Sequence, residues 1–357
     1  MDHLMRRNEL TQRCAELDVD ALLVTKLANV RYLTGFTGSS AMALLSPEGS
    51  VFFTDGRYGE QSRHEVPDLT RVASMENLTG AVLDYVRRLG VGRLGFERHA
   101  VTMAQRDRWE EMFEGVELIG IGEEVERLRL AKDTEELAIL RSAQDATDGA
   151  FDDILDLLVV GITERQAAAQ LELAMSRHGA DALAFDPIVA FGDHAAEPHH
   201  RPCHRALSEG DVIKMDFGAM VDGYHTDMTR TVAFGEPATE LRKVHDVVAA
   251  AQQAGIDAVR PGVVAGDVDR AARSVIDDAG YGDRFTHGLG HGVGLEIHEG
   301  PWLRRDGDDV LPVGAVVTVE PGVYLAGMGG VRIEDAVEVT EDGASVLGAS
   351  TRELIEL

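Results

Sequence analysis

The stretch Val212-Ile213-Lys214-Met215-Asp216-Phe217-Gly218 is the most informative part of the second half of this chain. It predicts an apolar strand that ends near a carboxylate, Asp216. A buried charge at such a position is costly unless a partner or a metal ion compensates it. The dipeptide Asp222-Gly223 predicts a type I′ hairpin turn, and pairing Val221 with Tyr224 places position 229 opposite position 216. Asp227 is then the diagonal neighbour on the same face. Two carboxylates this close favour a shared proton or divalent cations between them.

A second hairpin repeats this arrangement near the end of the chain. Residues 314–320 form an apolar segment that ends in Glu320, and Gly327 lies midway between Glu320 and Glu334. If the chain folds back at Gly327, the two glutamates lie opposite each other. In the return strand, the apolar positions 331, 333, 337 and 339 share one face, whereas Arg332 and Glu334 share the other.

Between the hairpins, residues 287–298 contain a histidine surrounded by glycines. Four glycines within seven residues argue against a helix, so this is not the helical H-E-x-x-H motif of zincins. The whole candidate ligand set is one imidazole with four carboxylates: His291, Asp216, Asp227, Glu320 and Glu334. Any one of them alone would be interpreted as a solvent-exposed residue. Together they predict a site for two divalent ions, and the oxygen-rich set favours Mn²⁺, with Co²⁺ or Zn²⁺ as alternatives.

The pattern of elements divides the chain into two domains. Residues 1–124 alternate strands, at 21–24, 41–45, 51–54 and 93–96, with helices that extend to about residue 17 and cover residues 76–89 and 103–113. Long helical patterns follow at 133–158 and 163–178, the second opened by a capping box at 163–166. Strands near 187–191, 211–218 and 224–232 and helices near 241–259 and 267–279 come next. We therefore predict an α/β N-terminal domain, residues 1–124, and an α+β C-terminal domain, residues 125–357.

Composition narrows the classes of partner and compartment. The 357 residues include 62 acidic and 34 basic side chains, and the formal net charge of −28 disfavours nucleic acid and anionic membrane surfaces. No apolar run approaches the roughly 18 residues of a membrane span. Cys14 and Cys203 are too few for a disulfide framework, so both are interpreted as structural thiols in a reducing compartment. We expect a cytoplasmic protein with neither a nucleic-acid nor a membrane partner.

The motifs that contain the candidate metal ligands resemble those of the creatinase/methionine aminopeptidase family, the "pita-bread" metallopeptidases. Nearly the whole chain resembles the Xaa-Pro peptidase branch of this family. The motifs are Met215-Asp216-Phe217-Gly218, Thr226-Asp227-Met228-Thr229-Arg230, residues 287–298, Val319-Glu320-Pro321-Gly322-Val323-Tyr324 and Arg332-Ile333-Glu334-Asp335. The resemblance implies a C-terminal catalytic pita-bread domain behind a creatinase-like N-terminal domain.

The same resemblance implies roles for the ligands. Asp216 binds one metal ion, Asp227 and Glu334 bridge both, and His291 and Glu320 bind the other. A hydroxide that bridges the ions would be the nucleophile, and Glu320 would shuttle its proton.

Three further residues are predicted to act near the substrate. In Pro198-His199-His200-Arg201-Pro202, His199 aligns with the histidine of the family's Pro-His-Gly motif, although His200 stands where glycine is usual. His298 would contact the scissile carbonyl oxygen and help to stabilise the tetrahedral intermediate. Arg332 either contacts the substrate or holds a nearby carboxylate.

The N-terminal half bears on substrate length and assembly. Residues 29–40 and Thr54-Asp55-Gly56-Arg57-Tyr58 resemble the N-terminal domain of aminopeptidase P proteins more than that of typical prolidases. This favours substrates longer than a dipeptide. In relatives this domain mediates dimerisation, which implies a homodimer or a higher homo-oligomer. Without the resemblance, the segment would be interpreted as a hairpin and turn with surface residues.

These implications predict a dinuclear metal-dependent Xaa-Pro aminopeptidase, which releases the residue before proline from a proline-containing peptide. An Xaa-Pro dipeptidase (prolidase) is the alternative. A non-catalytic peptide-binding protein of the same fold is disfavoured because all five ligands are present. A creatinase-like amidinohydrolase ranks lowest, since such enzymes do not have the full carboxylate set.

Overall fold

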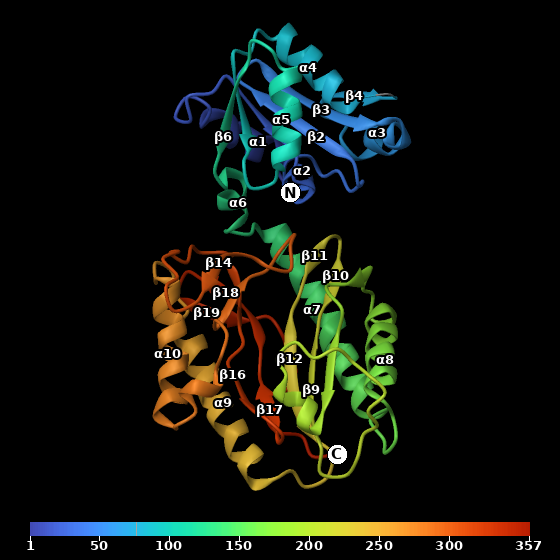
Figure 1. The fold of residues 1–357 in the computed structure, drawn as a ribbon, viewed down its shortest axis with the longest axis vertical. Coiled ribbons are helices and arrows are strands. Elements are labelled where there is room, and N and C mark those ends of the chain that lie inside the picture. Colours follow the sequence, from blue (N-terminus) through green and yellow to red (C-terminus); the bar gives the residue numbers. More distant parts are fainter. Residues whose placement is uncertain (76) are drawn as a thin grey trace. The chain divides into compact units, whose positions relative to one another are not determined.

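A computed structural model of the chain describes residues 1–75 and 77–357 and divides into two compact units, Met1–Arg129 and Leu130–Leu357 (Figure 1). The first unit ends at Arg129, five residues after the boundary at residue 124 that the pattern of elements predicted. The reason is helix α6 (Glu124–Arg129), which contacts helices α1 (His3–Gln12) and α2 (Leu27–Thr34) of the first unit. Among the described residues, no helix combines the length and the apolar character needed to cross a bilayer.

The first unit is built on a six-stranded mixed sheet with the strand order β4-β3-β2-β1-β5-β6. Its strands are β1 (Ala21–Val24), β2 (Ala41–Ser46), β3 (Gly49–Asp55), β4 (Thr70–Ser74), β5 (Arg93–Glu97) and β6 (Glu117–Ile121). Its other helices are η1 (Gly56–Tyr58), α3 (Gln61–Glu65), α4 (Leu78–Arg88) and α5 (Met103–Met112). Apolar side chains of α4 and α5 form one core with the sheet, while α1 and α2 contact β2. The predicted α/β architecture is confirmed.

Some local predictions for this unit were wrong. Helix α1 ends at Gln12, short of residue 17, and the edge strands β4 and β6 were missed. Residues 27–34 form helix α2, not the hairpin and turn that the segment suggested by itself. Gly35 ends this helix in the left-handed conformation, with φ of 79°, which is a usual helix stop. The helix expected at 76–89 is α4, and Glu76 itself lies outside the described residues.

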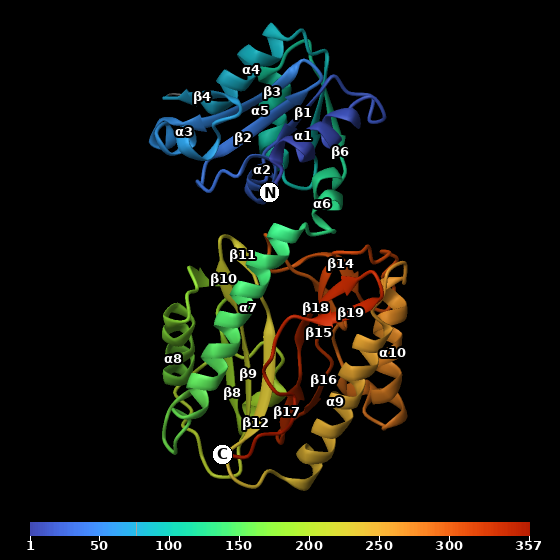
Figure 2. The same cartoon turned by 180° about the vertical axis from the view of Figure 1, so that it is seen from behind.

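The second unit packs helices on antiparallel sheets in two halves (Figure 2). Its first half contains α7 (Thr134–Leu155), α8 (Glu164–Arg177), β7 (Ala182–Leu183), β8 (Ile188–Phe191), η2 (Gly192–Ala196), β9 (Val212–Phe217), β10 (Ala219–Val221), β11 (Tyr224–His225) and β12 (Met228–Ala233). Its second half contains α9 (Thr239–Ala258), α10 (Ala265–Asp278), η3 (Gly282–Arg284), β13 (Gly290–Gly292), β14 (Glu299–Leu303), β15 (Val316–Val319), β16 (Gly322–Leu325), β17 (Gly329–Arg332), β18 (Asp335–Thr340) and β19 (Gly343–Val346). Helices α7 and α8 share a core with β8, β9 and β12, whereas α9 and α10 share one with β15, β17 and β18. The α+β prediction is confirmed.

The first hairpin has the register that its turn predicted. Val221 pairs with Tyr224, and Thr229 lies opposite Asp216. Residues 222 and 223 both have positive φ, 42° and 71°, as a type I′ turn requires. The return strand is nevertheless broken into β11 and β12, and Asp227 lies in the break. The predicted continuous strand over 224–232 was therefore wrong, because the backbone leaves the sheet where this carboxylate faces the pocket described below.

The second hairpin follows the same rule. Strands β15 and β18 pair as far as Val319 and Asp335, and β16 and β17 pair as far as positions 322 and 332. Glu320 and Glu334 therefore lie opposite each other in the gap between the two paired segments. Gly327, with φ of 74°, lies in the turn. Positions 331, 333, 337 and 339 all belong to the buried core, which confirms the predicted apolar face.

Candidate metal centre and active-site pocket

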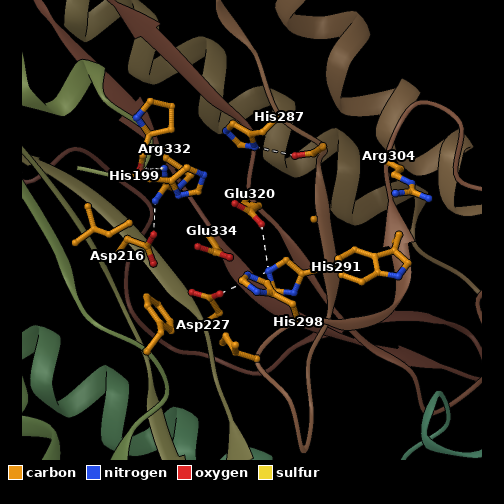
Figure 3. Close-up of a pocket in the computed structure, with 17 residues that line it drawn as sticks. His199, Asp216, Asp227, His287, His291, His298, Arg304, Glu320, Arg332 and Glu334 are labelled. Atoms are coloured by element: carbon orange, nitrogen blue, oxygen red, sulfur yellow. Dashed lines mark hydrogen bonds and ion pairs between the residues drawn. The ribbon is translucent and has the colours of Figure 1, made fainter. Parts of the chain in front are cut away.

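One pocket of about 450 Å³ in the second unit is lined by all eight residues that the sequence singled out (Figure 3). They are Asp216, Asp227, His291, Glu320, Glu334, His199, His298 and Arg332. The two hairpins supply the four carboxylates, and the glycine-rich segment between the hairpins supplies His291. The predicted constellation is therefore brought together from segments more than a hundred residues apart.

Asp227 and Glu334 are buried carboxylates that the protein compensates only in part. Within the described part of the chain, Oδ1 of Asp227 and Oε1 of Glu334 have no hydrogen-bond partner. Burial raises the pKa of Asp227, of Glu334 and of Glu320, the last to about 8, and neighbouring carboxylates raise those of Asp227 and Glu334 further. Buried carboxylates without donors are stabilised by cations, so these residues fit the divalent ions that the sequence predicted.

His291 is oriented as a metal ligand. Its Nδ1 lies 2.9 Å from the carbonyl oxygen of Gly292, which can only accept, so this nitrogen carries the proton. Nε2 is then left facing the acids, 3.7 Å from Oδ2 of Asp227 and 3.5 Å from Oε1 of Glu320. Asp227, His291 and Glu334 each offer a ligand atom within 4.8 Å of the others. Such a hydrogen bond at the second ring nitrogen is typical of metal-binding histidines.

Two glycines allow strand β13 to bring His291 into the pocket. A Cβ at Gly290 would lie 2.0 Å from the carbonyl oxygen of Thr318, and one at Gly292 would lie 2.0 Å from that of Gly300. Both neighbours are backbone atoms on the adjoining chain segments and cannot move aside cheaply. Glycine is therefore required on each side of His291 for the backbone to pack this closely.

Arg332 holds Asp216. It is 3% exposed, and its guanidinium forms an ion pair with the Asp216 carboxylate. The same group donates to the hydroxyl of Tyr324 at 3.0 Å and to the carbonyl oxygen of Pro198 at 3.2 Å. Of the two roles considered from the sequence, holding a carboxylate agrees with this geometry, and contact with a substrate stays a prediction.

Thr229 joins the two hairpins and was missed as a site residue. Its hydroxyl donates to Oε2 of Glu334 at 2.6 Å and accepts from Nε of Arg332 at 3.0 Å. The pairing of position 229 with Asp216 already carried a signal, because it placed this hydroxyl beside the predicted ligands. Hydrogen bonds of this kind orient ligating carboxylates and tune the metal that they bind.

Two exposed imidazoles complete the pocket. His199 and His298 are exposed, unlike the buried His291, and the rings of His298 and His291 have their centroids 4.4 Å apart. They are therefore the pocket histidines most accessible to a molecule arriving from solvent. His200, which stands where the family usually has glycine, does not line the pocket. It is buried and contacts Glu164 and Glu197 instead.

Other lining residues had no assigned role at the sequence level. His287 lies 2.8 Å from the hydroxyl of Tyr324, and burial lowers the pKa of His287 to about 3. It begins the glycine-rich segment, so its position in the sequence was the available signal. The pocket also has an apolar part formed by Phe185, Ile188, Ile297 and Trp302. These side chains come from separate elements and share no sequence pattern.

Comparison with known proteins places this fold and site in one class. Residues 138–341 match the model of metallopeptidase family M24, and residues 6–131 match that of the creatinase/prolidase N-terminal domain. The chain belongs to metallopeptidase family M24. The expected pita-bread fold and the resemblance to the Xaa-Pro peptidase branch are confirmed, and the pocket carboxylates all lie within the matched residues.

Particular relatives cover almost the entire chain. An Xaa-Pro dipeptidase of Pyrococcus furiosus is 33% identical, over 98% of this chain and 99% of the relative. The solved structure of an Xaa-Pro dipeptidase from Bacillus anthracis has a TM-score of 0.97 and 37% identity, and the match covers 100% of both chains. An X-Pro aminopeptidase from Thermotoga maritima has a TM-score of 0.91 and 35% identity, over 99% of this chain and 100% of that one.

Proposed function

We propose that this protein is an Xaa-Pro dipeptidase, which hydrolyses the bond between a first residue and a C-terminal proline. The observation that carries the proposal is the complete acidic pocket in a chain that is similar over its full length to dipeptidases from Bacillus anthracis and Pyrococcus furiosus. Sequence motifs alone favoured an aminopeptidase. The full-length similarities give more support to the alternative.

Five residues would hold two divalent ions in this proposal: Asp216, Asp227, His291, Glu320 and Glu334. We propose Mn²⁺, because carboxylate oxygens dominate the ligand set, with Co²⁺ or Zn²⁺ as alternatives. When bound, such ions make water more acidic and polarise a carbonyl group. The unpartnered oxygens of Asp227 and Glu334 support this assignment, since both residues line the pocket and neither oxygen has a competing donor among the described residues.

The roles that we propose for the other pocket residues rest on how exposed each side chain is and on what it contacts. The side chain of Glu320 is 18% exposed, more than those of Asp216 at 11% and Asp227 at 8%, so it is the carboxylate best placed to pass a proton to an incoming molecule. The exposed rings of His199 and His298 can donate hydrogen bonds to the carbonyl oxygen of the peptide bond that is cleaved. Arg332 keeps Asp216 in place throughout.

Substrate length is tested with two peptides that share their first two residues. We expect Ala-Pro to be hydrolysed in the presence of Mn²⁺, and Ala-Pro-Ala to be cleaved at least about 10-fold more slowly. Metal content is measured on the same preparation, and Ala-Ala serves as the control without proline. Faster cleavage of the tripeptide would overturn the dipeptidase proposal in favour of an Xaa-Pro aminopeptidase, the activity named for the similar Thermotoga maritima protein.

We also propose a homodimer in the cytoplasm. The two cysteines are unpaired in the structure, which suits a reducing compartment. Light scattering after gel filtration gives the mass in solution directly. A mass of one chain, against the 38.6 kDa of the monomer, would contradict the dimer.

A further inference from the structure

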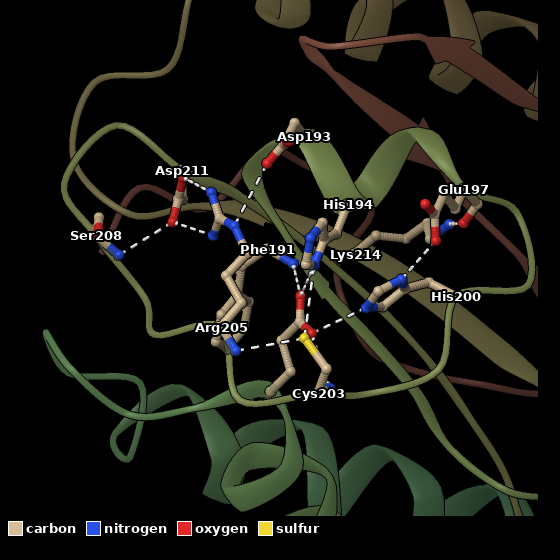
Figure 4. A network of polar contacts seen from close by, with 11 residues as sticks. Phe191, Asp193, His194, Glu197, His200, Cys203, Arg205, Ser208, Asp211 and Lys214 are labelled. Carbon is tan, nitrogen blue, oxygen red and sulfur yellow. Dashed lines mark hydrogen bonds and ion pairs between the residues drawn. The ribbon is translucent and has the colours of Figure 1, made fainter.

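A second group of potential metal-ligating side chains lies in the second unit (Figure 4), and none of its members lines the pocket. Glu164 is the first residue of α8, His194 lies in η2, and His200 and Cys203 lie in the segment between η2 and β9. These four residues, which we call the Glu164 cluster, each offer a ligand atom, and all four atoms lie within 4.8 Å of one another. Two imidazoles, a thiol and a carboxylate make a soft and nitrogen-rich set, unlike the oxygen-rich pocket.

The contacts within the cluster converge on the fully buried carboxylate of Glu164. Oε1 of Glu164 is 2.9 Å from Nδ1 of His194 and accepts from the backbone N–H of Phe191 at 2.9 Å. Oε2 is 2.9 Å from Nε2 of His200 and accepts from the backbone N–H of Cys203 at 3.0 Å. Sγ of Cys203 lies 4.0 Å from Nδ1 of His194. One point in space is therefore within reach of all four ligand atoms.

The surroundings resemble those of an established metal site. Nδ1 of His200 contacts Oε2 of Glu197 at 2.7 Å, so the other ring nitrogen of this candidate ligand is held by a carboxylate. Metal-binding histidines usually donate their second N–H to a carboxylate or carbonyl, and ligating carboxylates are themselves hydrogen-bonded. The two backbone donors of Glu164 satisfy the second condition. Both conditions would persist if an ion replaced the imidazole protons that face Glu164.

We propose that Glu164, His194, His200 and Cys203 bind one divalent ion of the zinc class. Tetrahedral zinc with bonds of about 2.0–2.3 Å separates its ligand atoms by roughly 3.3–3.8 Å. The separations of 2.9 Å and 4.0 Å lie on either side of that range, and all four ligand atoms lie within 4.8 Å of one another, so an ion would draw them together by about 1 Å or less. Binding releases the protons of the thiol and of the imidazole nitrogens that face the ion. The thiolate and the carboxylate then neutralise the two positive charges.

Another acidic group is a weaker candidate. Glu97, His99 and Glu126 in the first unit also offer ligand atoms within 4.8 Å of one another. Lys26 already places its ammonium 3.2 Å from Oε1 of Glu126, and Asn29 donates to both glutamates. A cation is therefore present there without a metal. The Glu164 cluster differs because its thiol adds a ligand that a hydrogen-bonded network of carboxylates and imidazoles does not need.

Four protein ligands leave no coordination position open, so the ion would be structural. Its effect would reach the pocket through the chain between its ligands. Pro198 accepts a hydrogen bond from Arg332 at 3.2 Å, and His199 lines the pocket. An ion on His194, His200 and Cys203 would tie down both ends of this segment.

Cobalt spectroscopy tests the proposal, because the candidate ligands of the pocket offer only oxygen and nitrogen. The full-length protein is stripped with a chelator and titrated with Co²⁺. We expect a sulfur-to-cobalt charge-transfer band in the near ultraviolet whose final intensity corresponds to one thiolate-bound ion per chain, while ions bound in the pocket add nothing to this band. Cys203→Ser should abolish the band, whereas Cys14→Ser, which removes the buried cysteine of the first unit, should leave it unchanged. Absence of the band in the wild type, or its survival in Cys203→Ser, would overturn the proposal.

A second measurement needs no variant and so does not depend on correct folding of Cys203→Ser. The stripped wild-type protein is alkylated with iodoacetamide, with and without Zn²⁺, and each cysteine is followed by peptide mass spectrometry. Zn²⁺ should slow alkylation of Cys203 at least 10-fold and leave Cys14 unaffected. Equal rates for Cys203 in both conditions would show that its thiol does not bind the ion.

Discussion

Both the acidic pocket and the Glu164 cluster bury carboxylates, but the pocket leaves two carboxylate oxygens without a donor, whereas both oxygens of Glu164 have one. In the pocket, Oδ1 of Asp227 and Oε1 of Glu334 have no partner among the described residues, whereas each oxygen of Glu164 contacts two nitrogen atoms. The pocket therefore depends on cations for charge compensation, and the cluster is compensated before any ion binds. Buried acidic side chains therefore indicate a metal site most strongly where the protein provides no hydrogen-bond donor to their oxygens.

The largest effect is expected from Asp227→Asn. The amide keeps the shape of the side chain but loses the charge that would hold the ions, so kcat/KM on Ala-Pro should fall by about 1,000-fold or more. Asp222→Asn is the matched control, because it changes an exposed acid in the turn of the same hairpin and asparagine tolerates positive φ. Equal activities of the two variants would contradict a metal role for Asp227.

The next largest effect is expected in the Glu164 cluster, where a substitution should lower the stability of the protein. In Glu164→Gln, an amide nitrogen replaces one oxygen and faces N–H donors, so the free energy of unfolding should fall by about 3 kcal/mol. Urea denaturation of the metal-stripped protein measures the change. Glu172→Gln, on an exposed position of the same helix α8, should change it by less than about 0.5 kcal/mol. If both variants are equally stable, the contacts of Glu164 do not compensate its burial.

Thr229→Val should have a smaller effect on the pocket. The substitution keeps the volume but removes the hydroxyl that donates to Glu334, and loss of such a supporting hydrogen bond lowers metal affinity or activity by about 10–100-fold. Metal titration and kcat/KM on the same preparation measure it. Thr229→Ser retains the hydroxyl and should recover most of the loss, which a purely steric role would not predict.

The smallest effect concerns the buried thiol of Cys14. Burial raises the pKa of Cys14 to about 11, so the folded state favours the protonated form. This contribution to stability is present below the ordinary thiol pKa near 9 and is lost as pH rises towards 11. At pH 9, alkylation of Cys14 in the folded protein should therefore be at least about 10-fold slower than in urea. Equal rates would show that the thiol is accessible.

Short-range geometry explains what the sequence could predict. Turn chemistry at residues 222–223 and the position of Gly327 set the two hairpin registers, and these placed the four carboxylates in pairs. Helix α2 was missed although its terminal Gly35 was visible, because no capping side chain marks its start at Lys26. The edge strand β4 has the sequence Thr-Arg-Val-Ala-Ser and lacks a strong apolar pattern, whereas β6 contains Leu118, Ile119 and Ile121, an apolar signal that was overlooked.

Long-range packing explains what the sequence could not predict. The contact of Thr229 with Glu334 joins residues 105 positions apart, and no local pattern encodes it. His200 is a similar case: it departs from the family motif, and only the fold shows that it turns towards Glu164. Pairing within a hairpin follows from alternation along a strand, whereas docking between hairpins depends on the shapes of both cores.

The hydrogen bond from Thr229 to Glu334 also bears on the order of folding. Each hairpin closes a short loop at low entropic cost, whereas this bond closes one of 105 residues. We therefore expect the hairpins to form first, with their carboxylates still hydrated, and the two halves of the unit to dock later. The charges meet only in that late step, so the ions that offset them stabilise the assembled protein rather than its early hairpins.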